Sequence, residues 1–309
     1  MSVAQSNLIG ANACSLPLQG VTPDLVYRIG GISFGLIAEG GVRVAVEPGL
    51  SDFVVETKGC DIQIQVGWSE KLEKPSCKPT FDSGGLWCVY KVPGGHQFYF
   101  STPFLGLSPY KAAWFDGEFK SGRVELFQEY FHADGPVYPM EYPLDELLMI
   151  HRLSRGEGLE VHAVGIVDES GCGHLFLGHS GAGKSTTARL WESRKDIHIL
   201  SDDRIILRAR NGEIWMYGTP WHGDAGVASP RAARLTQIYL LEHAGENELI
   251  TLGHTRAAAE LLARSFVPYH SAEGLDFAMG FADQVARETP CSIFRFVPDE
   301  SAVEAICRA

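Results

Sequence analysis

The chain has 309 residues, 45% of them hydrophobic and 21% charged, which is the composition of a globular protein with one large domain or two ordinary ones. Its formal net charge is -12 and its pI is about 5.4, and because proteins that coat a nucleic-acid backbone usually carry a basic surface, this balance argues against a nucleic-acid partner. Seven cysteines with no CxxC pair among them argue against a disulfide framework and a zinc site.

The N-terminal residues indicate the compartment. Residues 1–14 show no basic start followed by an apolar core, so we expect no secretory signal. The apolar stretch 30–38 is too short to span a bilayer. The sequence therefore predicts a soluble, cytoplasmic protein with no membrane partner, in which scattered thiols fit a reducing environment.

The first part of the chain has the patterns of β-strands. Apolar and polar side chains alternate, which gives a strand one buried and one exposed face, and Pro93-Gly94-Gly95 predicts a hairpin. The expected strands are 62–66, 87–92, 96–101, 111–115 and 123–131. Because no catalytic grouping occurs here, we interpret residues 1–140 as a β-rich N-terminal domain for recognition or assembly.

The second part alternates between strand and helix periods. A helix is expected to open at Pro143, because proline suits the first helical turn, and to end before Gly156. Strands are expected at 159–167, 174–177, 197–200, 205–208, 213–217, 237–241 and 292–297, and helices at 185–195, 255–265, 273–288 and 300–309. Residues 141–309 are therefore predicted to form an α/β domain with a mixed β-sheet and flanking helices.

Residues 178–186 read GHSGAGKST and match the pattern GxxxxGK[ST] between an apolar strand and a helix. Glycines let backbone N–H groups converge on phosphate oxygens, Lys184 faces the β- and γ-phosphates, and the Ser185 hydroxyl is a natural Mg²⁺ ligand. The following helix points its positive dipole end at the phosphates. The motif predicts binding of ATP with Mg²⁺ by Gly178, His179, Ser180, Gly181, Ala182, Gly183, Lys184, Ser185 and Thr186.

An acidic pair, Asp202-Asp203, follows the expected strand 197–200. In P-loop proteins an acidic residue at the end of a neighbouring strand helps to hold the metal. One carboxylate can orient Mg²⁺ while the other accepts a proton from an attacking hydroxyl, although a hydrolase would need similar parts. The same residues also suit a solvated turn or a helix cap. His162, on the strand 159–167, is by its pattern alone more often a core residue than a catalytic one.

Residues 218–224 read GTPWHGD and end a hairpin strand. Their mixture of residue types suits a loop that lines a pocket and suits an ordinary tight turn equally well. We name Trp221, His222 and Asp224 as candidate substrate residues, and Arg204 and Arg231 as candidate charge stabilisers.

Three motifs in order, EVHAVGIV (160–167), GHSGAGKST (178–186) and LSDDR (200–204), resemble the catalytic domain of HPr kinase/phosphorylase, which shares its nucleotide-binding core with ATP-dependent phosphoenolpyruvate carboxykinase. The resemblance covers residues 143–309 and implies a carboxykinase-like P-loop kinase domain. It implies that Asp202 is the catalytic base, that Asp203 and Ser185 support the metal, and that His162 is an active-site histidine. The glycine-rich segment with a metal-binding glutamate that follows the acidic pair in that family is replaced here by GTPWHGD.

The resemblance extends to small HPr-kinase-like proteins, some of which act as serine kinases on peptides in the biosynthesis of ribosomally made peptides. We therefore expect an ATP- and Mg²⁺-dependent kinase acting on a serine-type hydroxyl of a peptide or protein, with Lys184 and Asp202 central to transfer. One alternative is a carboxykinase-like phosphotransferase on a small hydroxyl metabolite, including free serine. Another is a non-catalytic partner protein that senses ATP. Self-association into a homo-oligomer stays open.

Overall fold

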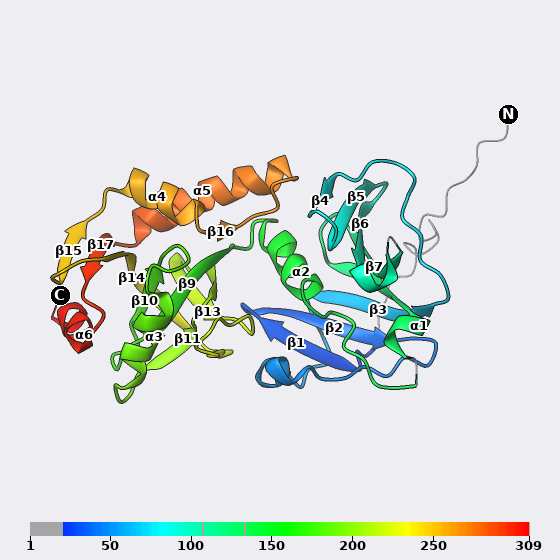
Figure 1. The fold of residues 1–309 in the computed structure, drawn as a ribbon, viewed down its shortest axis with the longest axis horizontal. Helices are drawn as coiled ribbons and strands as arrows, with labels where there is room; N and C mark the ends of the chain where they lie inside the picture. Colours follow the sequence, from blue (N-terminus) through cyan, green and yellow to red (C-terminus); the bar gives the residue numbers. More distant parts are fainter. Residues whose placement is uncertain (1–20, 107, 133, 309) are drawn as a thin grey trace. The chain divides into compact units, whose positions relative to one another are not determined.

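The computed structural model describes residues 21–106, 108–132 and 134–308 (Figure 1). The chain divides into two compact units; the first ends at Asp145, and the second begins at Glu146 and also takes in Ile29–Gly31. The sequence-based expectation for residues 1–14 lies outside the described residues. Within the described part, no helix is long and apolar enough to cross a membrane.

The first unit is built around one mixed sheet, which has eight strands within the described residues, in the order β1-β2-β3-β8-β7-β6-β5-β4. The β2–β3 and β3–β8 pairs are parallel, and the pairs from β8 through β4 are antiparallel. The strands are β1 (Leu25–Ile29), β2 (Ile32–Ala38), β3 (Ile62–Ser69), β4 (Phe81–Asp82), β5 (Trp87–Val92), β6 (Gly95–Ser101), β7 (Pro109–Asp116) and β8 (Ser121–Phe127). Short helical segments are η2 (Pro48–Phe53), η3 (Pro103–Leu105) and α1 (Gln128–Phe131).

The alternating pattern of β3 has the predicted effect. Ile62, Ile64 and Val66 are fully buried, whereas the glutamines between them are partly exposed. The hairpin β5–β6 turns at Gly94, whose φ of 84° suits glycine, and confirms the predicted hairpin. The strand expected at 123–131 is wrong at its end, because β8 stops at Phe127 and the chain continues as α1.

The second unit contains the larger sheet, of nine strands among the described residues, in the order β10-β9-β12-β13-β14-β17-β15, with β11 and β16 also paired to β9. The β10–β14 and β14–β17 pairs are parallel and the others antiparallel. The strands are β9 (Leu159–Val167), β10 (Gly173–Leu177), β11 (His198–Ser201), β12 (Arg204–Arg210), β13 (Glu213–Gly218), β14 (Ala232–His243), β15 (Glu248–Thr251), β16 (Ser265–Phe266) and β17 (Cys291–Phe296). The helices are α2 (Leu144–Leu153), which spans the boundary between the units, α3 (Lys184–Glu192), α4 (His254–Leu262), α5 (Ala272–Glu288) and α6 (Glu300–Cys307).

Helices cover both faces of this sheet. Leu261 of α4 and Phe281 and Val285 of α5 join one buried cluster with the sheet, and Figure 1 shows these two helices side by side. Trp191 of α3 and Ile306 of α6 belong to a second cluster on the opposite face. The expected α/β class with a mixed sheet and flanking helices is confirmed, although the helix expected at 255–265 ends at Leu262 and Ser265 opens β16.

Strand β9 organises the second unit, because it pairs with β10, β11, β12 and β16. Its carboxyl-terminal half lies between β10 and β11, and its amino-terminal half between β12 and β16. The loops that follow β10 and β11 and the segment that precedes β16 are therefore all anchored beside β9. This arrangement brings together segments that lie far apart in the sequence.

We expect Phe176→Ala to lower the free energy of unfolding of the second unit by about 3–5 kcal/mol, measured by urea-induced unfolding. Phe176 of β10 is fully buried, and its ring centroid lies 4.9 Å from that of Tyr239 and 6.2 Å from that of Trp191. Met279→Ala in α5 is the control, because Met279 is 46% exposed and its loss should change the free energy by no more than about 0.5 kcal/mol. Equal losses in the two variants would contradict this packing.

Candidate functional site

The glycine loop fills the space between the end of β10 at Leu177 and the start of α3 at Lys184. Gly181 and Gly183 have φ angles of 81° and 99°, a region that side chains rarely allow. A Cβ on Gly183 would lie 2.6 Å from the ring of Phe296, and one on Gly178 would lie 2.7 Å from the Cβ of Ala182. The loop conformation therefore requires the glycines of the motif.

The start of α3 points at this loop. No side chain among the described residues caps the helix, whose N-cap is Gly183. The first N–H groups of a helix lack partners within it and carry the positive end of its dipole. The Thr187 hydroxyl donates to the carbonyl of Gly183 at 3.0 Å and closes the first turn. This end of the helix is therefore suited to an anion.

Lys184 is held in the loop rather than extended into solvent. Its side chain donates from Nζ to the carbonyls of Gly178 at 3.0 Å and His179 at 3.1 Å. Because an ammonium group has three donors, one remains without a bond among the described residues. Burial, and then the charges of Arg204 and Arg264, lower the pKa of Lys184 to about 8. Lys184 is thus charged at neutral pH, in surroundings that favour a bound anion.

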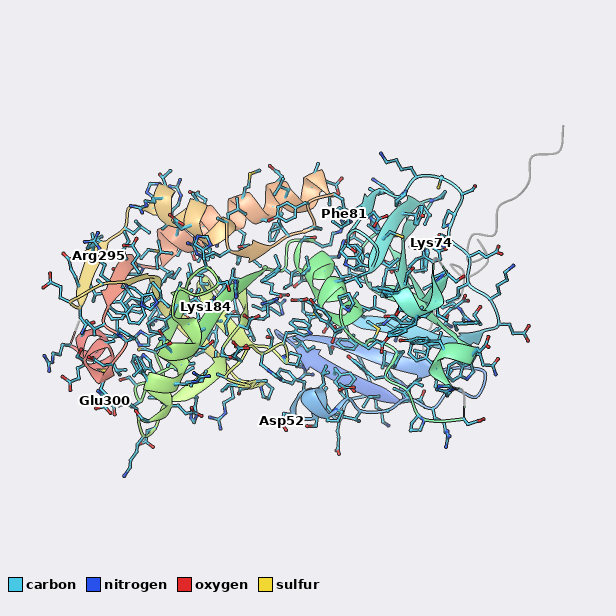
Figure 2. The ribbon with its side chains drawn as sticks, in the orientation of Figure 1. Asp52, Lys74, Phe81, Lys184, Arg295 and Glu300 are labelled. Carbon is cyan, nitrogen blue, oxygen red and sulfur yellow. The ribbon has the colours of Figure 1, made fainter. Side chains whose placement is uncertain are left out.

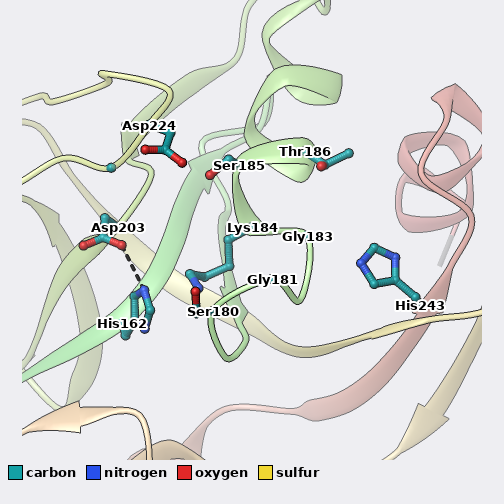
Figure 3. Close-up of a pocket in the computed structure, with 11 residues that line it drawn as sticks. His162, Ser180, Gly181, Gly183, Lys184, Ser185, Thr186, Asp203, Asp224 and His243 are labelled. Atoms are coloured by element: carbon teal, nitrogen blue, oxygen red, sulfur yellow. Dashed lines mark hydrogen bonds and ion pairs between the residues drawn. The ribbon is translucent and has the colours of Figure 1, made fainter.

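A cavity of about 320 Å³ opens beside this loop (Figure 3). Figure 2 places Lys184 at the loop end of α3. The residues proposed from sequence that line the cavity are Ser180, Gly181, Gly183, Lys184, Ser185, Thr186, His162, Asp203 and Asp224. Gly223, from the candidate loop 218–224, also lines it, and the structure adds His243, which the sequence did not single out. Residues from β9, α3, the turn after β11, the end of β14 and two loops therefore meet at one place.

His162 and Asp203 form a hydrogen-bonded pair on the cavity wall. His162 lies on β9 directly opposite Arg204 of β12. Its Nε2 is 2.9 Å from Oδ1 of Asp203, the residue before Arg204 (Figure 3). Burial, followed by the charges of Lys184, Arg204 and Arg264, lowers the pKa of His162 to about 4. The imidazole is therefore neutral at neutral pH and donates its Nε2–H to the carboxylate.

Asp202 has a different environment from its neighbour. It is only 1% exposed, and its two carboxylate oxygens accept the backbone N–H groups of Gly223 at 2.9 Å and Ala225 at 2.8 Å. Asp202 therefore holds the end of the loop 218–224 and does not line the cavity. Of the two carboxylates of the acidic pair, it is Asp203 that lines the cavity.

Of the remaining candidates, only Asp224 lines the cavity. Arg204 lies behind Asp203, paired with it and with Glu146, and its guanidinium stacks 4.1 Å from the ring centroid of Phe266. Trp221 is partly buried and accepts the Ser201 hydroxyl at its carbonyl, 3.3 Å away.

The other two candidates are exposed. His222 contacts the carbonyl of Gly223 at 3.1 Å, within its own loop. Arg231 stands just before β14 and does not line the cavity. The structure therefore does not bring His222 or Arg231 to the phosphate loop.

Sequence reasoning missed Arg264, which lies between α4 and β16. It is 8% exposed and donates from Nη1 to the carbonyl of Glu260 at 2.8 Å and to its carboxylate at 2.6 Å. Its Nη2 is 2.8 Å from Nε2 of His179 in the glycine loop. Nothing in the local sequence indicates this contact, because the two residues are 85 positions apart.

The charges around the cavity are mixed but localised. Lys184, Arg204 and Arg264 all act on His162, while Asp203 and Asp224 provide carboxylate oxygens at the cavity wall. Among the described residues, no group of three or more His, Cys, Asp and Glu side chains gathers to hold a metal ion by itself. The arrangement combines a group of positive charges, which suits a polyphosphate, with a few carboxylate oxygens on the same wall.

Fold and site together define a mixed α/β protein with a cavity between a glycine loop and the start of a helix. No protein-family model and no curated protein matches the chain. Among solved structures, the Hpr(Ser) kinase/phosphatase from Coxiella burnetii is similar over 48% of this chain and 93% of that chain, with 16% identity and a TM-score of 0.30. A likeness at this level carries no argument about activity.

The pKa of Lys184 predicts how nucleotide affinity depends on pH. Below about pH 8 the ammonium group attracts phosphate, whereas above it the free protein must take up a proton before binding. We expect the dissociation constant for ADP to rise above about pH 8, by at most about tenfold per pH unit. Equilibrium dialysis between about pH 7.5 and pH 9.5 measures it, where the charge of a phosphate group is constant.

Lys184→Arg is the matched control, because a guanidinium group stays charged throughout this range. The dissociation constant of that variant should be flat where the wild-type value rises. A rise of the same size in both proteins would mean that another group titrates.

Proposed function

We propose that this protein is an ATP- and Mg²⁺-dependent kinase that transfers the γ-phosphoryl group to a serine-type hydroxyl of a peptide or protein. The observation that carries the proposal is the hydrogen-bonded pair His162–Asp203, which shares one cavity with the glycine loop and Lys184. Such a pair provides a carboxylate of fixed orientation beside a cradle for phosphate groups. The residue pattern of the loop and its resemblance to HPr-kinase-like proteins point to the same chemistry.

The loop fits a nucleoside triphosphate. Gly181 has open space where a Cβ would stand, so phosphate oxygens can approach its backbone. The uncapped start of α3 and the remaining donor of Lys184 can bind the β- and γ-phosphates. Arg204 and Arg264 add positive charge near the loop, although each is already paired with a glutamate.

The same wall fits Mg²⁺. Ser185, Asp203 and Asp224 would hold it, because they offer hydroxyl and carboxylate oxygens, which are the ligands that a hard cation prefers. Figure 3 shows the carboxylate of Asp224 turned toward the hydroxyl of Ser185. When bound, Mg²⁺ neutralises charge that develops on the transferred phosphoryl group. Asp224 is therefore a candidate metal ligand in addition to a substrate contact.

In the proposed transfer, the acceptor oxygen attacks the γ-phosphorus, and the bond from that phosphorus to the oxygen bridging the β-phosphate breaks, which releases ADP. The proton of the acceptor hydroxyl passes to the carboxylate of Asp203. Neutral His162 donates to Oδ1 of Asp203 and fixes its orientation, while Lys184 and the loop hold the phosphates in line. This proposal gives Asp203 the role of base, which the family resemblance assigned to Asp202, and gives Asp202 a supporting role in the loop 218–224.

Asp202 supports the acceptor side of the cavity. Because its carboxylate holds the backbone at Gly223 and Ala225, it fixes the loop that carries Trp221, His222 and Asp224. We propose that this loop contacts the acceptor and that the first unit recruits the peptide or protein in the cytoplasm. The acidic balance of the chain argues for an acceptor other than nucleic acid.

Asp203→Asn should keep nucleotide binding and lower phosphoryl transfer by about 10²–10⁴-fold, because the amide cannot accept the hydroxyl proton. Lys184→Ala should lose nucleotide binding, because the cation is removed from the cradle. Transfer is measured with γ-labelled ATP, Mg²⁺ and serine-containing peptides, beside free serine, and binding is measured with ADP. Transfer by Asp203→Asn at the wild-type rate would exclude Asp203 as the base.

Asp202→Asn is the matched variant of the neighbouring carboxylate. An asparagine keeps one acceptor oxygen, so one of the two backbone N–H groups loses its partner at a cost of about 1–3 kcal/mol in stability. Its transfer should fall less than that of Asp203→Asn. Transfer to free serine alone would favour the small-metabolite alternative, and ATP binding without transfer to any acceptor would favour a sensing role.

A further inference from the structure

Arg264 connects two walls of the candidate site. Its side chain is almost fully buried and is fixed at one end by Glu260 of α4, which accepts from Nη1 with both its carbonyl and its carboxylate. The other end of the guanidinium group reaches the glycine loop. The residue is therefore pre-oriented by a helix that does not itself line the cavity.

The contact with the loop is made to His179. Nη2 of Arg264 lies 2.8 Å from Nε2 of His179. Because arginine nitrogens only donate, Nε2 of His179 must accept, and the proton of the neutral ring resides on Nδ1. The carbonyl of the same histidine accepts from Nζ of Lys184 at 3.1 Å. Arg264 thus restrains the residue that in turn holds the lysine.

The backbone of Arg264 makes the second connection. Its carbonyl accepts the N–H of His162 at 2.7 Å, immediately beside the β16–β9 pairing. One residue therefore links the loop that would hold the phosphates to the strand that carries the pair His162–Asp203. The side chain sets the position of one wall and the main chain that of the other.

We propose that Arg264 is a positioning residue that fixes the spacing between the phosphate loop and the pair His162–Asp203, and that it does so through His179. This inference rests on the proposed kinase function and names a residue that neither the motif nor the family resemblance includes. A displacement of about 1 Å between reacting groups can cost about 10²-fold in rate. Arginine is suited to the role because its planar fork binds Glu260 and His179 at once, which a lysine cannot do.

The ring proton of His179 tests the contact without nucleotide. Nitrogen-15 NMR of the full chain should show the Nδ1–H form for His179 in the wild type. In Arg264→Met, which has no donor, the ring should return to the mixture of forms seen for a free imidazole. A wild-type His179 that carries its proton on Nε2 would overturn the proposal, whether or not the protein transfers phosphate.

A double-mutant cycle tests the function. Arg264→Met and His179→Ala should each lower kcat by about 10–100-fold while changing the dissociation constant of ADP by less than about threefold, and the double variant should be no slower than either single one. His179→Gln should recover much of the rate, because its amide oxygen can accept from Arg264, whereas Arg264→Lys should not. Losses that multiply in the double variant, together with rescue by lysine, would show that Arg264 acts by its charge alone.

Arg256→Met is the matched control, because Arg256 lies on α4, the helix of Glu260, is exposed, and pairs with Glu260 from 3.7 Å. Its rate and thermal midpoint should equal those of the wild type. Thermal midpoints of the Arg264 variants identify any loss of folding. If the wild type transfers phosphate but the losses of the two single variants multiply in the double variant, only the role of Arg264 is contradicted. If the wild type does not transfer phosphate, the kinase function is overturned. In that case the ring proton of His179 still tests the contact with Arg264.

Discussion

The glycine loop, the acidic turn, His162 and Arg264 all depend on the backbone pairing of β9. Its partners β10 and β11 lead into the glycine loop and the acidic turn, and β12 and β16 follow Asp203 and Arg264 directly. Because a shift of one residue in strand register turns every side chain to the other face, these hydrogen bonds determine which residues meet. With His162 opposite Arg204, the carboxylate of Asp203 lies within reach of the imidazole. The strand register of β9 therefore determines which side chains can meet, and their chemistry acts only on that set.

Electrostatics then sets the state of the groups that register brings together. Burial and like charge act in the same direction on His162 and Lys184, and they lower the pKa of both. The histidine becomes a neutral donor, whereas the lysine stays charged near neutrality. Glu146 and Glu260 pair with Arg204 and Arg264 and so keep these cations near the cavity. A bound polyanion would relieve the mutual repulsion that remains among these cations, so the electrostatics of the cavity favour an anionic ligand.

The parts of this site that local sequence determines were predictable. The glycine loop follows from steric needs at Gly181 and Gly183, and the strand before it and the helix after it follow from periodicity. Strands β1 and β2 were missed, because β2 is buried along nearly its whole length and its apolar run lacks the alternation of β3. The predicted helix 255–265 overlaps the short strand β16 at Ser265, because a strand of two residues shows no period.

Long-range contacts could not be read from the sequence. Arg264 reaches His179 across 85 positions, and its neighbours in the chain show only a helix that ends. The choice between Asp202 and Asp203 was also hidden, because both residues occupy one turn between β11 and β12 and no periodic pattern fixes the direction of a side chain there. Family resemblance supplied roles for the pair, whereas the hydrogen bonds of each carboxylate distinguish the two.

The division of the acidic pair links the two sides of the proposed reaction. Asp203 faces the phosphate loop, and Asp202, one residue earlier, holds the loop 218–224 through two backbone N–H groups. Since the same turn carries both carboxylates, a movement of the acceptor loop would shift the proposed base with it. In the proposed kinase, the loop that would contact the acceptor is thus bonded to the turn that carries the proposed base. Two adjacent aspartates thus differ in their environment: Asp202 is buried and bonded to two backbone N–H groups, whereas Asp203 faces the cavity.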